Sequence, residues 1–523
     1  MTRLYQQSRN FFTPHRGPGA DGAAMGAAAG APRAPAGALP GALLGALLLA
    51  GLPSPARADG AGYANLPDLG NPADLALTPE IERRFYRVML RQISSQLEHD
   101  QETVYYLRKV GNSLVRGSRR NPEDFTFVVI KDERINAFAA PGGLVGINTG
   151  IFLHAESEHE LAAVLAHEIA HVTQKHMARA FEKQGSLRLK SFAALLGGIL
   201  LSAYDPQLGH AAITLSQAGT LQSQINFTRD NEEEADRIGM QVLASSGYNP
   251  GGMPGFFGRL LQASRGLQSI VPEFLRTHPL TEKRVAEAEN LAQGYSWNRR
   301  RPDPDFPLIK IRLQLASQPG AVQAVQFFQD QLEAADSVPE AELEPLRYGY
   351  ALALFEAGRP EEARQQIAAL LARDEGRLGY LLAAGRMALA DGRKREGMAL
   401  LERARTAFPD HPQPVLEQAR GLLEGGDPYK AQRLLRDYGR FRAHPGIQYY
   451  ELLAQAEAGA GYSVEAALAL AEVDYLKGQT EGAIQRLNGV LEQGGMGNYQ
   501  QQRLEARLRE LLVERELEKR AKL

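Results

Sequence analysis

The sequence predicts a mainly α protein in which an α+β domain with a small β-hairpin sheet precedes an α-solenoid of short helical repeats. Three observations support this fold class. Helical periodicity dominates the chain, β-rich runs are confined to residues 125–153, and small residues recur every 34 positions from residue 358 onward. The mixture of 44% apolar and 23% charged residues is typical of packed domains and excludes a disordered or multi-span membrane chain.

The first 58 residues show the order of features of a secretory signal. A Gly-, Ala- and Pro-rich stretch with four arginines precedes the apolar run ALPGALLGALLLAGL, and the tripeptide ARA ends at Ala58 as a small-x-small site. The alternative, an uncleaved anchor, would need about 20 apolar residues. We expect cleavage after Ala58, with Met1 or Met25 as the translation start, and export to a bacterial periplasm.

The charge and cysteine counts narrow the classes of partner and site. The 61 acidic and 59 basic residues nearly cancel, so no basic field favours nucleic acid, and we expect no nucleic-acid partner. The chain has no cysteine, which excludes disulfides, thiolate metal sites and a cysteine nucleophile. Any metal must therefore bind to His, Asp or Glu.

The first domain is predicted over residues 59–303. Thr78 and Pro79 form a cap and first-turn pair that starts a helix, with Ile81, Phe85, Met89 and Ile93 on one face. The runs FTFVVI, RINAFA and LVGINTGIF then predict a small hairpin sheet.

A long helix is predicted next, from a Ser157–Glu160 capping box to about Lys183. The apolar, glycine-bearing segment 185–229 leaves two interpretations open. It is either a core helix or flap, or a surface that makes peripheral contact with a membrane or a hydrophobic client.

The second domain is predicted over residues 304–523, after the proline-rich stretch RRRPDPDFP. Gly358, Gly392 and Gly426 are 34 residues apart, and a small residue follows each of them five positions later. This period is typical of tetratricopeptide repeats, whose stacked helix pairs present a concave binding surface. Gly478 falls 52 residues after Gly426, which predicts one expanded or irregular repeat. We expect the tyrosines to fill repeat cores, namely Tyr348, Tyr350 and Tyr380.

The motif His167-Glu168-Ile169-Ala170-His171 carries the chemistry. On a helix, His167 and His171 project from one face and can hold one metal ion, while Glu168 can take a proton from metal-bound water. The alternative is a pair of hydrogen-bonded core histidines. The apolar neighbours of the motif favour the metal, because buried imidazoles need partners.

A catalytic zinc site takes a third protein ligand and leaves a fourth position to water. The run NEEEADRIG supplies carboxylates on a second helix, where Glu232 and Asp236 share one face at i, i+4. One of them can bind the metal while the other holds a ligand histidine in its tautomer. Glu234 points elsewhere on this helix.

HEIAH, EEEAD some 60 residues later, NAFAAPGG before the motif and THPLTEKR after it are together similar to the M48 zinc metallopeptidases. The resemblance implies a zincin-like metallopeptidase domain with one Zn²⁺ per chain. It also implies His167, His171 and Glu232 as zinc ligands, Glu168 as the catalytic base and Asp236 as a supporting carboxylate. The substrate should be reached from the aqueous side, because the chain lacks the hydrophobic helices of the integral-membrane members.

Two residues of the THPLTEKR run are candidates for stabilising the tetrahedral oxyanion, His278 and Arg284. For His278 two other interpretations stay open: a surface loop histidine, or a fourth ligand that occupies the open zinc position in a resting state. The hairpin at residues 136–139 is expected to offer an edge strand to an extended substrate.

The predicted function is a periplasmic zinc endopeptidase that hydrolyses misfolded or misassembled envelope proteins. The resemblance implies outer-membrane β-barrel proteins and their assembly machinery as clients and partners, recruited by the repeats. The alternative is a repeat-based chaperone or adaptor in which proteolysis is secondary. Three further histidines are clustered near the motif and raise the alternative of extra metal sites: His154, His159 and His176. We expect His176 to lie on an exposed face instead, because it is about 140° from His171 on the helix.

Overall fold

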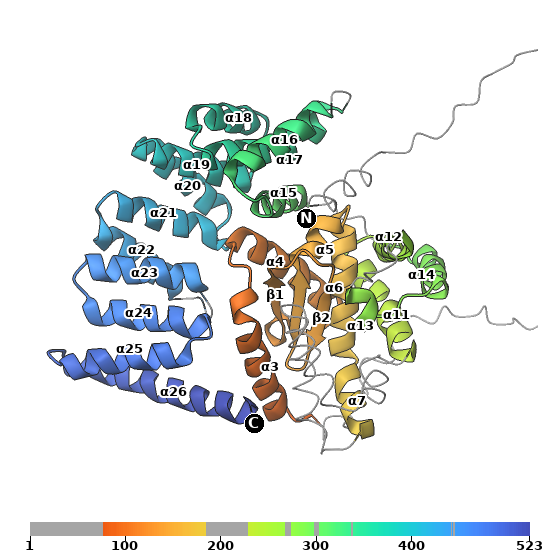
Figure 1. Ribbon diagram of the computed structural model, residues 1–523, viewed down its shortest axis with the longest axis horizontal. Helices are drawn as coiled ribbons and strands as arrows, with labels where there is room; N and C mark the ends of the chain where they lie inside the picture. The colour runs from red at the N-terminus through yellow and green to blue at the C-terminus, as the bar shows by residue number, and fades with distance from the viewer. Residues whose placement is uncertain are drawn as a thin grey trace, which may run out of the picture. The chain divides into compact units, whose positions relative to one another are not determined.

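The computed structural model describes residues 77–184, 229–266, 273–297, 303–335, 338–440, 442 and 445–522. Within these ranges the chain is mainly α with one small sheet, as predicted (Figure 1). The predicted signal at residues 1–58 lies outside the described residues, as does the apolar segment 185–229 except for its last residue. No helix of the described ranges is both long and apolar enough to cross a bilayer.

The part of the chain before residue 295 contains the sheet and the helices around it. These elements are α3 (Pro79–Ile93), η2 (Ser94–Gln96), α4 (Gln101–Gly117), η3 (Pro122–Asp124), β1 (Thr126–Ile130), β2 (Ala137–Ala140), β3 (Leu144–Asn148), α5 (Thr149–His154), α6 (Glu158–Thr173), α7 (His176–Gln184), α11 (Arg229–Ser245), α12 (Gly252–Gly266), α13 (Glu273–Thr277) and α14 (Glu282–Gly294). The predicted start of α3 is confirmed, since the Thr78 hydroxyl accepts a hydrogen bond from the Ile81 amide at 3.4 Å.

The three strands lie in the order β1-β3-β2. β2 and β3 form the predicted antiparallel hairpin, with Ala137 opposite Ile147. The prediction of a plain hairpin sheet is wrong for β1, which pairs parallel to β3 with Thr126 opposite Leu144. Residues 131–136 carry the chain across to the other side of β3, so that β2 is left with a free edge among the described strands.

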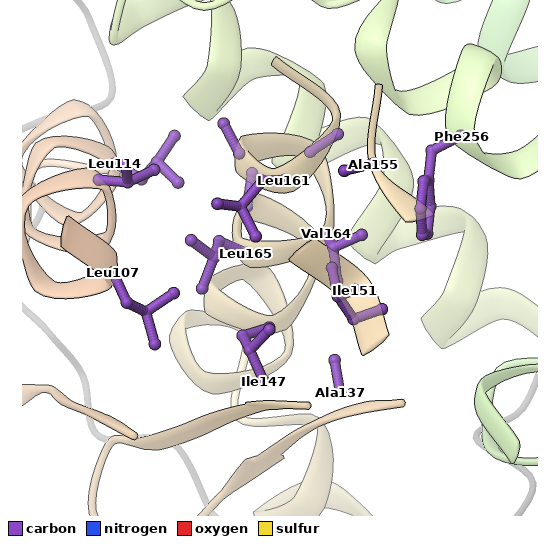
Figure 2. Packing of buried hydrophobic residues seen from close by; sticks show 14 of the residues in the cluster. Leu107, Leu114, Ala137, Ile147, Ile151, Ala155, Leu161, Val164, Leu165 and Phe256 are labelled. Atoms are coloured by element: carbon purple, nitrogen blue, oxygen red, sulfur yellow. The ribbon is translucent and has the colours of Figure 1, made fainter. Parts of the chain in front are cut away.

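Helix α6 lies at the centre of this domain and is apolar on nearly every face. Figure 2 shows Leu161 and Leu165 of α6 beside Leu107 of α4, with Ile147 of the sheet below them. Helices α11 and α12 cover the remaining sides of α6, where Phe256 is buried. A helix packed on all sides is held rigidly, which suits an element that must position side chains.

The predicted long helix over residues 157–183 is wrong in two respects. Ser157 precedes α6, but its side chain caps no amide; Glu160 instead binds Arg259, with Nη1 to Oε1 at 2.7 Å. The helix also ends at Thr173, because Lys175 adopts a left-handed conformation with φ 54°. The chain therefore changes direction before α7 begins at His176.

The rest of the described chain is a succession of helices, drawn from green to blue in Figure 1. They are α15 (Phe306–Ala316), α16 (Ala321–Glu333), α17 (Glu340–Glu356), α18 (Pro360–Arg373), α19 (Leu378–Ala390), α20 (Lys394–Ala407), α21 (Pro412–Glu424), α22 (Pro428–Gly439), α23 (Ile447–Gly459), α24 (Ser463–Leu476), α25 (Thr480–Gln493) and α26 (Asn498–Lys522). Consecutive helices pack in pairs, and Tyr348 and Tyr380 fill their cores as predicted.

The repeat glycines lie at the turns between paired helices. Gly358, Gly392 and Gly426 have φ of 74°, 76° and 79°, a conformation that favours glycine. The predicted expanded repeat is wrong. Gly461 lies at the turn of the next helix pair, between α23 and α24, 35 residues after Gly426. Gly478 lies at the following turn, between α24 and α25.

Helix α15 joins the two parts of the described chain. Phe306 and Ile309 belong to the core around α6, whereas Leu308 and Ile311 belong to the core of the first repeats. Arg312 of the same helix is half-buried and binds Asp100 at 2.5 Å and Glu102 at 3.1 Å, both at the start of α4. The domain boundary at residues 303/304 stays a prediction.

Candidate metal centre

Three elements bring four possible ligands together. His167 and His171 lie one turn apart on α6, Glu232 lies in the first turn of α11, and His278 lies between α13 and α14. One donor atom from each lies within 4.8 Å of the other three, and all four side chains are buried. The Nε2 atoms of the two α6 histidines are 3.0 Å apart, and each lies 3.5 Å from a Glu232 oxygen.

Imidazole and carboxylate donors in this arrangement are the ligands that zinc prefers. Burying two imidazoles and a carboxylate in an apolar helix core costs free energy unless a cation or a network of hydrogen bonds compensates. The donor set therefore fits a single divalent ion. Two hydrogen-bonded core histidines, the alternative prediction, would not by themselves explain why Glu232 and His278 also converge on the same point.

Glu168 is buried next to this group and has an unusual environment. Neither of its carboxylate oxygens accepts a hydrogen bond from a described residue, and the ring Nε2 of His278 is 3.5 Å from Oε1. Burial raises the pKa of Glu168, although His278 and His167 partly oppose this effect. A buried carboxylate with unsatisfied acceptors and a raised pKa is a good general base for a nearby water.

Asp236 holds His167 from the far side of the ring, since its Oδ1 lies 2.9 Å from His167 Nδ1. The sequence left open which carboxylate of α11 faces the metal site. In the structure Glu232 is next to the Nε2 atoms of the histidines, and Asp236 is next to the outer nitrogen. This arrangement favours Glu232 as the ligand and Asp236 as the residue that fixes the tautomer of His167.

Arg284 of α14 binds both carboxylates. Its guanidinium donates to Asp236 through Nε and Nη2, both at 2.9 Å, and Nη1 lies 3.0 Å from Glu232. Nη1 also donates to the carbonyl oxygen of Pro279 at 2.7 Å. All three guanidinium nitrogens therefore have partners within the protein. This geometry favours a role for Arg284 in holding Asp236 and Glu232 over the predicted role in stabilising an oxyanion.

His176 was missed by the sequence analysis, and the prediction of an exposed face for it is wrong. Its side chain is fully buried, with Nδ1 2.8 Å from His171 Nδ1 and Nε2 3.2 Å from a Glu234 oxygen. The predicted angle of 140° assumed an unbroken helix. Because Lys175 turns the chain, His176 instead comes back to His171.

The hydrogen bonds around His176 fix its role. Glu234 accepts from Nε2 of His176, so Nδ1 of His176 is left to accept from Nδ1 of His171. His171 then keeps a lone pair on Nε2, the nitrogen that faces Glu232. The order Glu234, His176, His171 would thus orient the second candidate ligand as Asp236 orients the first. No sequence pattern indicated these contacts, because a turn separates His171 from His176 and Glu234 lies on a different helix, α11.

The electrostatics of the group favour a cation between its members. Burial lowers the pKa of His167, but its hydrogen bonds to Asp236 and Glu232 outweigh burial and raise it to about 10. Burial raises the pKa of Glu232, but His278 and His167 outweigh this effect and hold it well below its ordinary value. Burial and neighbouring imidazoles lower the pKa of His171, which keeps that ring neutral. The neutral ring of His171 and the ionised carboxylate of Glu232 are the forms that bind a metal, whereas His167 must release its proton when an ion binds.

His278 is 3% exposed, which argues against the surface loop alternative. Its Nδ1 lies 3.2 Å from Glu232 Oε1 and 3.3 Å from His167 Nε2. The Phe274 ring stacks on it, with 4.8 Å between ring centroids. His278 is therefore near enough to serve as a fourth ligand.

A cavity of about 600 Å³ opens beside His171. The turn between β2 and β3 forms one wall and Tyr86 of α3 forms another. β2 lies at the edge of the sheet, as predicted, so its outer backbone groups are directed away from β3. An extended peptide added along β2 would lie beside Ala139 and Ala140, which line the same cavity as His171.

The fold and this centre together define a metallopeptidase of the HExxH type that carries a helical repeat domain. Residues 101–292 match peptidase family M48. Over 476 residues the chain is 37% identical to the "Beta-barrel assembly-enhancing protease" of Escherichia coli K12. This alignment covers 90% of this chain and 94% of the relative. The chain belongs to peptidase family M48.

Two further relatives extend the comparison. The protein of the same name in Yersinia pestis is 34% identical over 453 residues, 85% of this chain and 91% of the relative. The "Mitochondrial metalloendopeptidase OMA1" of Schizosaccharomyces pombe is 29% identical over 215 residues, 40% of this chain and 60% of the relative. The bacterial relatives thus extend into the repeats, whereas the match to the mitochondrial one is shorter.

Proposed function

We propose that the chain is a periplasmic zinc endopeptidase that cleaves misfolded or misassembled outer-membrane proteins. The observation that carries this proposal is the cluster of His167, His171, Glu232 and His278 next to the unsatisfied carboxylate of Glu168. In the proposal, His167, His171 and Glu232 hold one zinc ion. His278 lies where it can take the fourth position and release it to substrate.

Bound zinc would polarise the scissile carbonyl and lower the pKa of its water to about 7. Glu168 takes the proton of the attacking water and passes it to the leaving amide nitrogen. Its burial supports this role, because a raised pKa brings the carboxyl closer to the pH at which both steps occur. Asp236 and Arg284 keep His167 and Glu232 in place during the reaction.

The substrate would bind as an extended strand along β2. Main-chain hydrogen bonds to an edge strand do not depend on sequence, and they require a segment that is not already paired. Such binding selects unfolded or unassembled segments over native ones. The cavity beside His171 would accept side chains of the bound segment.

The name of the bacterial relatives supports outer-membrane β-barrel proteins as clients and the β-barrel assembly machinery as a partner. The repeats would recruit them. Export to the periplasm, with cleavage after Ala58, agrees with this assignment. Peripheral membrane contact through residues 185–229 remains part of the proposal.

The decisive experiment compares the parent chain with Glu168→Gln and Glu232→Ala. We expect metal analysis to find one zinc per chain in the parent and in Glu168→Gln, and little in Glu232→Ala. Loss of the general base should lower the cleavage rate of an unfolded β-barrel protein about 10²- to 10⁴-fold. Full biological activity of Glu168→Gln would instead favour the chaperone or adaptor alternative.

A further inference from the structure

Helix α4 has two faces that lie in different surroundings. One face, with Leu107, Val110 and Leu114, is fully buried in the core around α6. The opposite face borders a cavity of about 390 Å³ whose other wall is formed by the repeats. Four of its residues follow helical spacing along this cavity, at i, i+3, i+7 and i+11: Tyr105, Arg108, Asn112 and Arg116.

The cavity carries an excess of positive charge. Arg108, Lys109, Arg116 and Arg442 line it, against one carboxylate, that of Asp410. Asp410 is 82% exposed and lies 3.4 Å from Arg442, and Lys109 is paired with Asp303. Arg108 and Arg116 are exposed, and neither forms an ion pair with any residue in the described ranges. Two guanidinium groups are therefore available to an anionic ligand.

Aromatic rings complete the lining. Tyr105 of α4 lines the cavity together with Tyr438 of α22 and Tyr449 of α23. The guanidinium carbon of Arg442 lies 5.2 Å from the Tyr438 ring centroid. Burial raises the pKa of Tyr105, Tyr438 and Tyr449, so their phenols stay protonated. Protonated phenols can donate hydrogen bonds to a carboxylate and present flat faces to an apolar side chain.

We propose that this cavity is a docking site for an acidic peptide segment that carries carboxylates beside aromatic side chains. Arginine pairs well with carboxylates, and the three tyrosines provide surface for rings. The side-chain amides of Gln101 and Asn112 can pair with the peptide backbone between these groups. A volume of about 390 Å³ is larger than a simple anion needs and falls in the range of ligand pockets.

The site goes beyond the proposed function, because binding there needs neither metal nor cleavage. It has one wall from α4, which packs on the metal-bearing helix α6, and one wall from the repeats. A peptide in the cavity would therefore contact both parts of the chain at once. Recognition of an acidic segment would be separate from strand addition at β2.

The experiment measures binding of the fluorescein-labelled octapeptide GSDFDFGS to the full chain by fluorescence anisotropy. Glu168→Gln is the background, so that the probe stays intact. We expect Arg108→Ser/Arg116→Ser to weaken binding about tenfold or more, since charge-assisted hydrogen bonds are lost. Asn112→Asp should weaken it in the same direction by adding a negative charge to the cavity wall. Binding should also fall as salt is raised.

The matched control is Arg420→Ser/Arg433→Ser, which removes two exposed arginines that do not line the cavity. This variant should bind the octapeptide like the parent. The neutral peptide GSNFNFGS should bind at least about tenfold more weakly than GSDFDFGS. Equal binding of the two peptides, or unchanged binding by the Arg108/Arg116 variant, would overturn the proposal. So would competition by inorganic phosphate or anionic vesicles as strong as that by the unlabelled peptide.

Discussion

His167 Nδ1 and Asp236 Oδ1 are 2.9 Å apart, although 69 positions separate the two residues in the sequence. The contact joins α6 to α11 and leaves Nε2 of His167 facing Glu232. Asp236 is itself held by two hydrogen bonds from Arg284. The orientation of His167, a candidate ligand, thus depends on a carboxylate that lies on the far side of its ring from Glu232.

Replacing this carboxylate tests its role. Asp236→Asn keeps the shape of the side chain but removes the charge that favours Nδ1–H on His167. We expect zinc affinity to fall about 10- to 100-fold, with a loss of activity that excess zinc partly restores. Competition with a chromophoric chelator measures the affinity. Asp230→Asn, an exposed position on the same helix, is the control and should behave like the parent.

The hydrogen bonds of His176 make a second prediction. His176→Ala should lower zinc affinity about tenfold, because His171 loses the acceptor that fixes its tautomer. Glu234→Gln should act in the same direction. The double variant should lose less than the two single losses combined, since both residues act through His171. Additive losses of zinc affinity would show that His176 and Glu234 act independently. His154→Ala, on α5, serves as the control.

His278 lies where it can compete with substrate for the fourth position on the metal. We expect His278→Ala to raise the basal rate of proteolysis of an unfolded protein, because the site no longer holds its own blocking group. Initial rates with a labelled unfolded substrate measure the effect at equal zinc content. Unchanged or lower proteolysis would show that His278 does not restrain the enzyme.

His411 predicts a pH dependence of stability. It is 4% exposed, lies 4.2 Å from the Tyr105 ring, and burial lowers its pKa to about 3. In the unfolded chain the pKa is about 6.5, so below that pH the unfolded state binds a proton that the folded state excludes. The free energy of unfolding should therefore decrease as pH falls from about 6.5 towards 3, by roughly 2–3 kcal/mol at pH 4.5.

Urea unfolding at pH 7.5 and 4.5, with chelator present, separates this effect from metal loss. His411→Asn should show a smaller difference between the two pH values than the parent does. Asparagine retains an oxygen that can accept from the Gln413 amide, as His411 Nδ1 does at 3.1 Å. The same difference in both chains would assign the acid sensitivity to other groups.

The sequence predicted the parts of the fold that depend on local patterns. The apolar face of α3, the β2–β3 hairpin and the glycine turns of the repeats all follow from spacing within a few turns of chain. The parallel pairing of β1 with β3 depends on the path of the intervening loop, which no periodicity records. Gly461 did carry a signal, since Ala466 follows it five positions later, but its 35-residue spacing departs from the period.

The candidate site was predictable to the same extent. Motif spacing indicated His167 and His171 as a pair, and the acidic run on α11 indicated where a third ligand would come from. His176 could not be placed, because its position depends on one left-handed residue, Lys175. The same holds for Arg284, whose donors are directed by the packing of α14 against α11.

The dispersal of the metal-site residues over three separate elements has a consequence for the life of the molecule. An unfolded chain does not hold these residues together, and a binding site that forms only on folding couples ion uptake to folding. In the proposed function, a chain that has not folded would therefore neither bind zinc nor cleave a peptide bond.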